Sequence, residues 1–146
     1  MKSIVEIEIN LPQRQIAELY ADPRNNPKWM HEGVRYEPVS GEEGMPGSTY
    51  RLVPTTEGMV FLATVVARNL PNELKLNLEG SDVDVAITVK MIALSSTKTK
   101  LISEEVFTFK GPGNATVNAS VNDAIKAAHR RHMEDFKSFA EGQPLL

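Results

Sequence analysis

Hydrophobic alternation with a period of two runs through the middle of this chain. Between Val34 and Lys110, six segments alternate apolar and polar residues, and stretches rich in glycine, proline, asparagine and serine separate them. The alternation is cleanest over 83–91, where valine, isoleucine and methionine occupy every second position. Such alternation is typical of antiparallel strands that bury one face and expose the other to water. The pattern therefore predicts a large antiparallel sheet with one covered face.

Seven strands are expected in all. The first lies at 4–9, where Val5, Ile7 and Ile9 alternate with two glutamates. The other six are expected at 34–39, 48–53, 59–68, 73–79, 83–94 and 98–110.

Two short helices are expected between the first strand and the second. Pro12 suits the first turn of a helix, which must end before Asp22-Pro23 because the residue before a proline avoids the helical region. Asn26-Pro27 repeats the combination of a capping residue and a proline, and predicts a second helix that ends near Gly33.

The period returns to 3.6 after the Gly-Pro-Gly run at 111–113. A capping box at 120–123 predicts the start of a long helix that ends near Glu141. An antiparallel sheet of seven strands must cover its apolar face, and this is the one long helix available for that purpose. The expected α+β fold is a seven-stranded curved sheet wrapped around the C-terminal helix, with a cavity between them.

The length and composition suit a single domain spanning residues 1–146. The chain is 41% apolar, and a chain of this size buries enough surface to be stable without disulfides or metals. It contains no cysteine, which excludes disulfide scaffolds, thiolate zinc sites and cysteine nucleophiles. The net charge is −3 with both signs scattered along the chain, so no nucleic-acid partner is expected.

Targeting and cofactor signals are not found either. No window approaches the ~18 apolar residues of a membrane span, so no stable membrane insertion is expected. Glutamates interrupt the first apolar stretch, which argues against a signal peptide and predicts a cytoplasmic protein. The glycines of 41–47 lead into a strand, not into the helix that a phosphate-cradling turn requires. His129 and His132 lack a predictable third ligand, so neither a metal nor another cofactor is expected.

The order of elements and a few local motifs resemble the START-like (SRPBCC) superfamily, which includes the polyketide cyclase/dehydrase family. The motif residues are Leu19-Tyr20-Ala21-Asp22-Pro23, Trp29, Gly41, Gly44 and Gly47-Ser48. The resemblance implies the helix-grip fold and a START-like domain. It also implies a ligand cavity between the sheet and the C-terminal helix, with its mouth near residues 41–47 and 54–58. No catalytic constellation is shared across the family, whose members include cyclases, lipid and hormone carriers, and chaperone activators.

Two of the motif residues have a structural interpretation. We expect Asp22 to help terminate the first helix and Trp29 to anchor the second helix on the edge of the sheet. The large apolar area of Trp29 also makes it a candidate wall of the cavity.

One face of the C-terminal helix holds a histidine among apolar residues. At helical spacing the stripe consists of Val121, Ile125, Ala128, His132, Phe136 and Phe139. A buried imidazole needs a partner, because an unsatisfied polar group costs about 1–3 kcal/mol. His132 is therefore either bonded to a backbone carbonyl or to Asp135, or it is a polar group of the cavity that orients a ligand or moves a proton. His129 lies near the boundary of the stripe and is expected to reach solvent.

The last strand supplies a candidate acid or base. If Leu101 and Phe107 face inward, the period of two also places Ser103 and Glu105 inward. The opposite assignment would bury Ile102, Val106 and Thr108 and would spoil the alternation of the charged residues, so we favour the first. Desolvation would raise the pKa of an inward Glu105, which makes it the best candidate general acid or base. The alternative is a structural charge bonded to a tyrosine or an arginine.

The remaining candidates for the cavity lining come from the same alternation. They are Tyr36, Tyr50, Met59, Phe61 and Met91, together with Phe107 and Phe136. A phenol can bury its ring and use its hydroxyl, and methionine provides a deformable apolar surface. Each of these residues could equally belong to the packed core.

Three functions are compatible with these residues. The favoured one is binding of a small hydrophobic or amphipathic molecule, such as a lipid, a polyketide or an aromatic metabolite, in the internal cavity. The second is a cyclase or dehydratase, of the lyase class, in which Glu105 or His132 transfers protons. The third is a partner-binding module, such as a chaperone activator, with a filled interior. A homodimer through a sheet edge or the helix end is compatible with all three.

Overall fold

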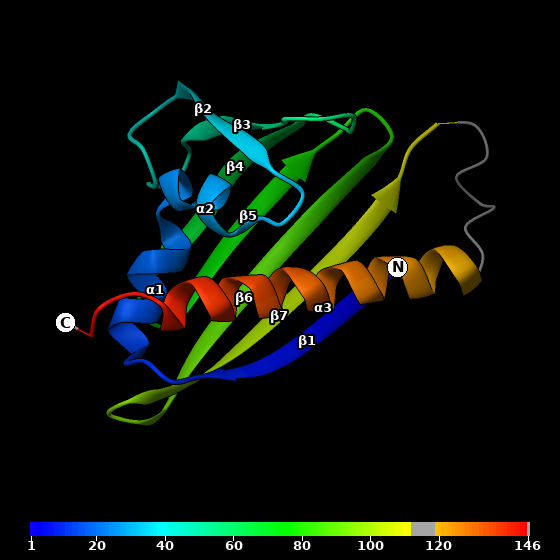
Figure 1. The fold of residues 1–146 in the computed structure, drawn as a ribbon. Coiled ribbons are helices and arrows are strands. Elements are labelled where there is room, and N and C mark those ends of the chain that lie inside the picture. Colours follow the sequence, from blue (N-terminus) through cyan, green and yellow to red (C-terminus); the bar gives the residue numbers. More distant parts are fainter. Residues whose placement is uncertain (112–118, 146) are drawn as a thin grey trace.

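An antiparallel sheet curves around one long helix in the computed structural model, which describes residues 1–111 and 119–145 (Figure 1). The strands are β1 (Lys2–Ile9), β2 (Val34–Ser40), β3 (Thr49–Pro54), β4 (Phe61–Asn69), β5 (Glu73–Glu79), β6 (Val83–Ser95) and β7 (Lys98–Phe109). The helices are α1 (Gln13–Ala21), the 3-10 turn η1 (Pro23–Asn25), α2 (Asn26–Trp29) and α3 (Ala119–Glu141). The expected helix-grip fold is confirmed, and each strand boundary lies within two residues of its prediction.

The sheet has the order β1-β7-β6-β5-β4-β3-β2, and all its pairs are antiparallel. Consecutive strands from β2 to β7 are therefore neighbours, and β1 pairs with the last strand. The pairing of β1 with β7 places Ser3 opposite Glu105, and Ile87 of β6 lies opposite Glu105 on the other side. Register shifts in the β2–β3, β4–β5 and β6–β7 pairs add local twist to the curved sheet.

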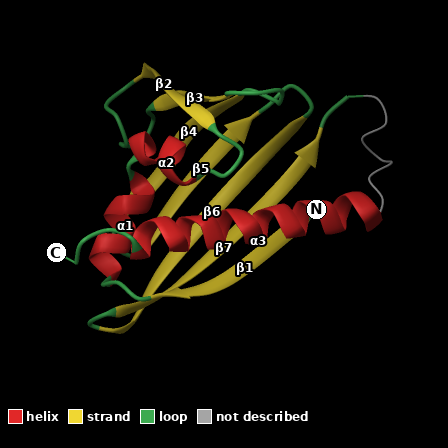
Figure 2. Cartoon of the chain, viewed as in Figure 1, coloured by secondary structure: helices red, strands yellow, loops and turns green. Residues whose placement is uncertain are grey.

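The short helices lie at one end of the sheet, beside the C-terminal end of α3 (Figure 2). Asp22 separates α1 from η1: its backbone N–H donates to Glu18, and its side chain accepts from the backbone N–H of Arg24 at 3.0 Å. This is the terminating role expected for Asp22. Gln15 of α1 also reaches the C-terminal segment, where its amide donates to the carbonyl of Pro144 at 2.7 Å.

The glycine-rich turn between β2 and β3 requires glycine at more than one position. Gly41 has a φ of +80°, and a Cβ there would lie 2.8 Å from the Cα of Ser48. Gly44 has the same φ, and its carbonyl accepts from Arg68 at 3.0 Å. The turn is thus built against β4 and not toward α3.

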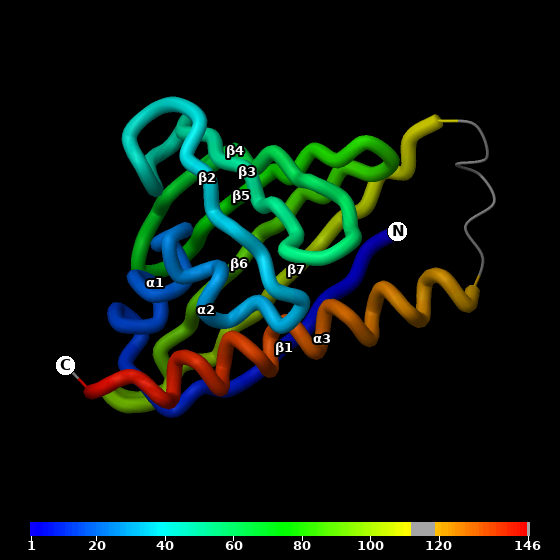
Figure 3. Tube along the Cα trace, turned by 45° about the horizontal axis from the view of Figure 1, so that its top comes forward, coloured from blue at the N-terminus to red at the C-terminus, as the bar shows by residue number. Residues whose placement is uncertain are grey.

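α3 runs along β1 across the concave face of the sheet (Figures 1 and 3). It begins at Ala119, so Ser120 lies inside the helix and not ahead of it. Residues 112–113 of the expected Gly-Pro-Gly break lie outside the described residues. No helix in the described ranges is both long and apolar enough to cross a membrane.

The buried stripe of α3 differs from the predicted one. Its buried residues are His129, Met133, Phe136 and Ala140, whereas Val121 is 40% exposed. The prediction that His129 reaches solvent is wrong, because this residue is 1% exposed. The reason is that α3 packs on β1 through one side and faces a cavity with the other, so the tightly buried side is rotated from the apolar stripe.

Three aromatic rings close the end of the sheet where the short helices lie. Trp29 stacks on Tyr20 with their ring centroids 6.0 Å apart, and both rings meet Phe136 edge to face at 5.5 and 5.0 Å. Trp29 therefore anchors α2 against α1 and α3, and α2 also contacts β2 at the edge of the sheet. This cluster forms the packed end of the interior.

Candidate functional site

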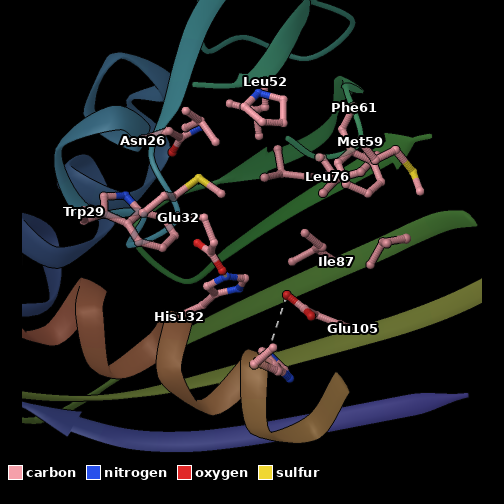
Figure 4. A pocket seen from close by; sticks show the side chains of 18 of the residues that line it. Asn26, Trp29, Glu32, Leu52, Met59, Phe61, Leu76, Ile87, Glu105 and His132 are labelled. Atoms are coloured by element: carbon pink, nitrogen blue, oxygen red, sulfur yellow. Dashed lines mark hydrogen bonds and ion pairs between the residues drawn. The ribbon is translucent and has the colours of Figure 1, made fainter. Parts of the chain in front are cut away.

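A cavity of about 380 Å³ lies between the concave face of the sheet and α3. Strands β3 to β7 line it on the sheet side, and α3 lines it through Ile125, Ala128, His129, His132 and Met133. Most of the lining is apolar, and Figure 4 shows Leu52, Phe61, Leu76 and Ile87 among these side chains. The apolar lining also includes Leu74, Leu78, Val85 and Phe107. A concave, mostly apolar space with a few polar groups is the usual form of a small-molecule site.

Two loops complete the lining. Residues 32–33, between α2 and β2, contribute one side with Val34 at the start of β2, and residues 56–59, between β3 and β4, contribute the other. The expectation for 54–58 agrees with this lining, but the turn at 41–47 is not part of it. That turn instead packs near Ala21, Pro23 and Arg68, through Gly44.

His132 and Glu32 join α3 to the first of these loops. The Nε2 atom of His132 hydrogen-bonds the carboxylate of Glu32, and the two side chains are 25% and 45% exposed. The hydrogen bond to His132 lowers the pKa of Glu32, against the effect of its partial burial. The partner of His132 is therefore neither Asp135 nor a backbone carbonyl, and the pair lies at the edge of the cavity.

Glu105 projects from β7 into the cavity (Figure 4). Its side chain is 13% exposed, and within the described residues its carboxyl group has no hydrogen-bond partner. Its Oε2 atom lies 3.7 Å from the Nε2 atom of His129. Desolvation raises the pKa of Glu105 to about 7, so the group changes charge near neutral pH.

His129 lies beneath Glu105 and is held from both sides. Its Nδ1 atom is 2.8 Å from the hydroxyl of Ser3 on β1, and its Nε2 atom is 2.9 Å from the hydroxyl of Ser103 on β7. A neutral imidazole can satisfy two hydroxyls in this way, because one ring nitrogen donates and the other accepts. Burial lowers the pKa of His129 to about 4, so the ring stays neutral at physiological pH.

A second polar atom of the lining residues lacks a partner. The indole N–H of Trp29 is buried and finds no acceptor among residues 1–111 and 119–145. An unsatisfied buried donor costs about 1–3 kcal/mol. Trp29 therefore contributes an uncompensated donor beside the cavity.

The structure brings seven of the predicted ligand-binding residues to the cavity. These are Trp29, Tyr50, Met59, Phe61, Glu105, Phe107 and His132. They come from α2, β3, β4, β7, α3 and the loop before β4, so only the tertiary fold assembles them. The inward face of β7 is the one that includes Leu101, Ser103 and Glu105, as the alternation favoured.

The other four predicted ligand-binding residues do not line the cavity. Met91 is 2% exposed in the core, Phe136 is fully buried in the aromatic cluster, and Ser103 is covered by His129. Tyr36 packs edge to face on Tyr50 at 5.3 Å, and its hydroxyl donates to Glu43. Met91, Phe136 and Ser103 therefore belong to the packed interior, and Tyr36 lies outside the lining.

Several polar residues at or beside the site were not among the predicted ligand-binding residues. Ser3 continues the alternation of Val5 and Ile7 by one step, so its inward orientation could have been predicted. Glu32 lies in a loop, where no periodic pattern of the sequence predicts the orientation of a side chain. The burial of His129 differs from what helical spacing predicts, because its two hydroxyl partners allow a histidine to lie in the core.

Comparisons with known proteins identify the fold. No family model matches the sequence, and no curated protein matches it. A START superfamily protein from Mycobacterium smegmatis is 18% identical, with a TM-score of 0.71 over 97% of this chain and 94% of that one. Ara h 8.0201 is 16% identical, with a TM-score of 0.75 over 98% and 99%. Norcoclaurine synthase from Thalictrum flavum, solved as a truncated form, is 12% identical, with a TM-score of 0.70 over 99% and 96%. At these identities the likeness shows the fold alone, and the chain has the START-like helix-grip fold.

Proposed function

We propose that this protein binds a small hydrophobic or amphipathic molecule in the cavity between the sheet and α3. The observation that supports this proposal is the cavity itself, because about 380 Å³ of apolar-lined space is kept open inside a domain of 146 residues. Interiors are normally packed to crystal density, and an unfilled space this large lowers stability. A protein whose interior served only to support a partner-binding surface would be expected to fill it.

The polar groups of the lining favour a ligand with one polar end. Glu105 projects into the cavity without a hydrogen bond from the described chain, while aliphatic and aromatic side chains form most of the remaining surface. A few placed polar groups in an apolar pocket orient a ligand and give specificity. The START-like fold of the solved neighbours agrees with such a site, and supports it at the level of the fold.

A fluorescence titration with N-phenylnaphthylamine, a neutral apolar probe, tests the proposal. We expect saturable binding of one probe per protein. Ala128 lines the cavity from α3, whereas the adjacent Ala127 is exposed, so the two positions offer a matched pair. Ala128→Trp should fill the cavity and weaken binding by at least about tenfold, and Ala127→Trp should leave it unchanged. Equal binding by both variants, or no binding by the wild type, would refute the proposal.

A second candidate function rests on Glu105. A carboxyl group with a pKa of about 7 is suited to donate and accept protons at physiological pH, as a cyclase or dehydratase acting on a polyketone requires. Such an enzyme would cyclise a synthetic poly-β-ketone, with a loss of turnover of at least about 100-fold in Glu105→Gln and with probe binding retained. Unchanged turnover in Glu105→Gln would remove this candidate and leave the binding protein.

A further inference from the structure

The acidic and basic side chains that line the cavity are glutamates and histidines. Among the described residues that line it are Glu32, Glu57 and Glu105, together with His129 and His132, and no lysine or arginine. The imidazole of His132 is engaged by Glu32, and that of His129 is engaged by two hydroxyls. No fixed positive charge in this lining is therefore available to bind an anionic ligand.

Glu105 is the one carboxylate of the lining that is both deeply buried and without a hydrogen bond from the described chain. An ionised carboxylate in such a place is costly unless a positive charge or hydrogen-bond donors compensate it. An anionic headgroup beside it would add repulsion. A cationic headgroup would supply the compensation that the protein does not.

Aromatic side chains line the same space. Tyr20, Trp29, Tyr50, Phe61 and Phe107 all line the cavity, from α1, α2, β3, β4 and β7. The face of an aromatic ring carries negative electrostatic potential and attracts an ammonium group, most strongly where water is excluded. A carboxylate together with several aromatic rings is a chemical environment that selects an organic cation.

We propose that the ligand of this cavity is an apolar molecule with a positively charged nitrogen, and that the carboxylate of Glu105 binds that nitrogen. This inference rests on the proposed function and adds the chemical class of the ligand. The apolar body of the molecule packs on the leucines and Phe61 at the sheet side, and the ammonium group donates a hydrogen bond to Glu105.

The ionisation of Glu105 gives the proposal a pH signature. The titratable groups that line the cavity together with this carboxyl are His129 and His132 of α3, Tyr20 of α1, Tyr50 of β3, and Glu32 and Glu57 of the two loops. With its pKa raised to about 7, Glu105 is protonated in much of the unliganded protein at neutral pH. Binding of an ammonium group therefore releases a proton, and amine affinity rises as the pH increases from about 6 to about 8.

A matched trio of ligands tests the class directly. Naphthylethylamine, naphthylethanol and naphthylacetate share one apolar body and differ in the charge of the polar end. By isothermal titration calorimetry at about pH 8, we expect the amine to bind about tenfold or more tightly than the alcohol, and the acid to bind most weakly. In Glu105→Gln the amine should fall to the affinity of the alcohol, whose own affinity stays within about twofold.

The control variant is Glu104→Gln, which removes a carboxylate from the opposite face of the same strand. It should retain the full preference for the amine. A preference for the acid, or a preference for the amine that survives Glu105→Gln, would overturn the inference while the alcohol still binds and the proposed function stands. Failure of all three compounds to bind would overturn both.

Discussion

The two halves of α3 meet the sheet in different ways. Toward its C-terminal end, Phe136 and Ala140 are fully buried, and Phe136 packs against Tyr20 of α1 and Trp29 of α2. Toward its N-terminal end, Ile125 and Ala128 are half-buried because the space in front of them is empty. One amphipathic helix thus serves as a core element at one end and as a cavity wall at the other.

The two histidines of α3 show the same contrast over a distance of three residues. His129 is fully enclosed and neutral between two serine hydroxyls, whereas His132 is partly exposed and bonded to a loop carboxylate. A single turn of the helix therefore separates a structural imidazole from one at the edge of a candidate ligand site. The comparison indicates that burial alone does not identify a functional residue in this fold.

The largest expected effect compares two phenylalanines. Phe136→Ala should lower the free energy of unfolding by about 3–5 kcal/mol, because this ring is fully buried in the aromatic cluster. Phe107→Ala should cost less than about half as much, since that ring already faces empty space. Chemical denaturation measures both. Equal losses would show that the two halves of the interior are packed alike.

Glu105→Gln is expected to raise the free energy of unfolding, by a smaller amount than Phe136→Ala lowers it. The pKa of Glu105 is raised from 4.5 to about 7, so the folded state holds a proton that the unfolded state has lost. The contribution of Glu105 to the stability of the wild type is therefore fully present below about pH 4.5 and is lost as the pH rises through about 7. At about pH 8 the variant should be more stable than the wild type by roughly 3 kcal/mol, and near pH 4 the two should match. A wild-type stability that does not decline over this range would contradict the buried, unpaired carboxyl.

A third prediction concerns the packed side of α3. Ser103→Ala leaves one nitrogen of His129 without a partner, which should cost about 1–3 kcal/mol of unfolding free energy. His129→Ala should also destabilise the protein. The double variant should lose less than the sum of the single variants, because both remove the same hydrogen bond. Strict additivity in thermal or chemical denaturation would show that the two side chains do not interact.

The smallest effect is expected at the edge of the cavity. Glu32→Gln weakens a contact between partly exposed groups, and should change stability by less than about 1 kcal/mol. Because this pair joins α3 to a loop that lines the cavity, the variant should instead speed dissociation of bound N-phenylnaphthylamine, measured by stopped-flow fluorescence. A large loss of stability without a change in dissociation would place the pair in the packed half.

The comparison also explains what could be predicted from the sequence. The strands can be predicted because each buries one face, so that apolar and polar residues alternate along its sequence. The inward orientation of Glu105 followed from the same rule. The role of His129 could not follow from helical spacing, since its partners Ser3 and Ser103 lie on β1 and β7 and only the strand order brings them together.

For a related reason, the sequence does not distinguish residues that line the cavity from residues of the packed core. Tyr50 and Tyr36 lie on neighbouring strands with similar sequence surroundings, yet only Tyr50 reaches the cavity. Phe136 lies on the apolar stripe with His132, but the short helices cover it. Whether an apolar side chain meets a neighbour or empty space depends on the curvature of the sheet and on where α3 crosses it, and alternation does not encode either.

Methyl chemical shifts measured by NMR during titration with N-phenylnaphthylamine test the ligand site most directly. Leu52, Leu76 and Val85 line the cavity, whereas the side chains of Ile4, Ile92 and Leu94 are 53%, 45% and 48% exposed elsewhere on the strands. We expect saturable shifts in the first group and none in the second. Shifts in the exposed group while the cavity methyls stay unchanged would contradict a ligand site between the sheet and α3.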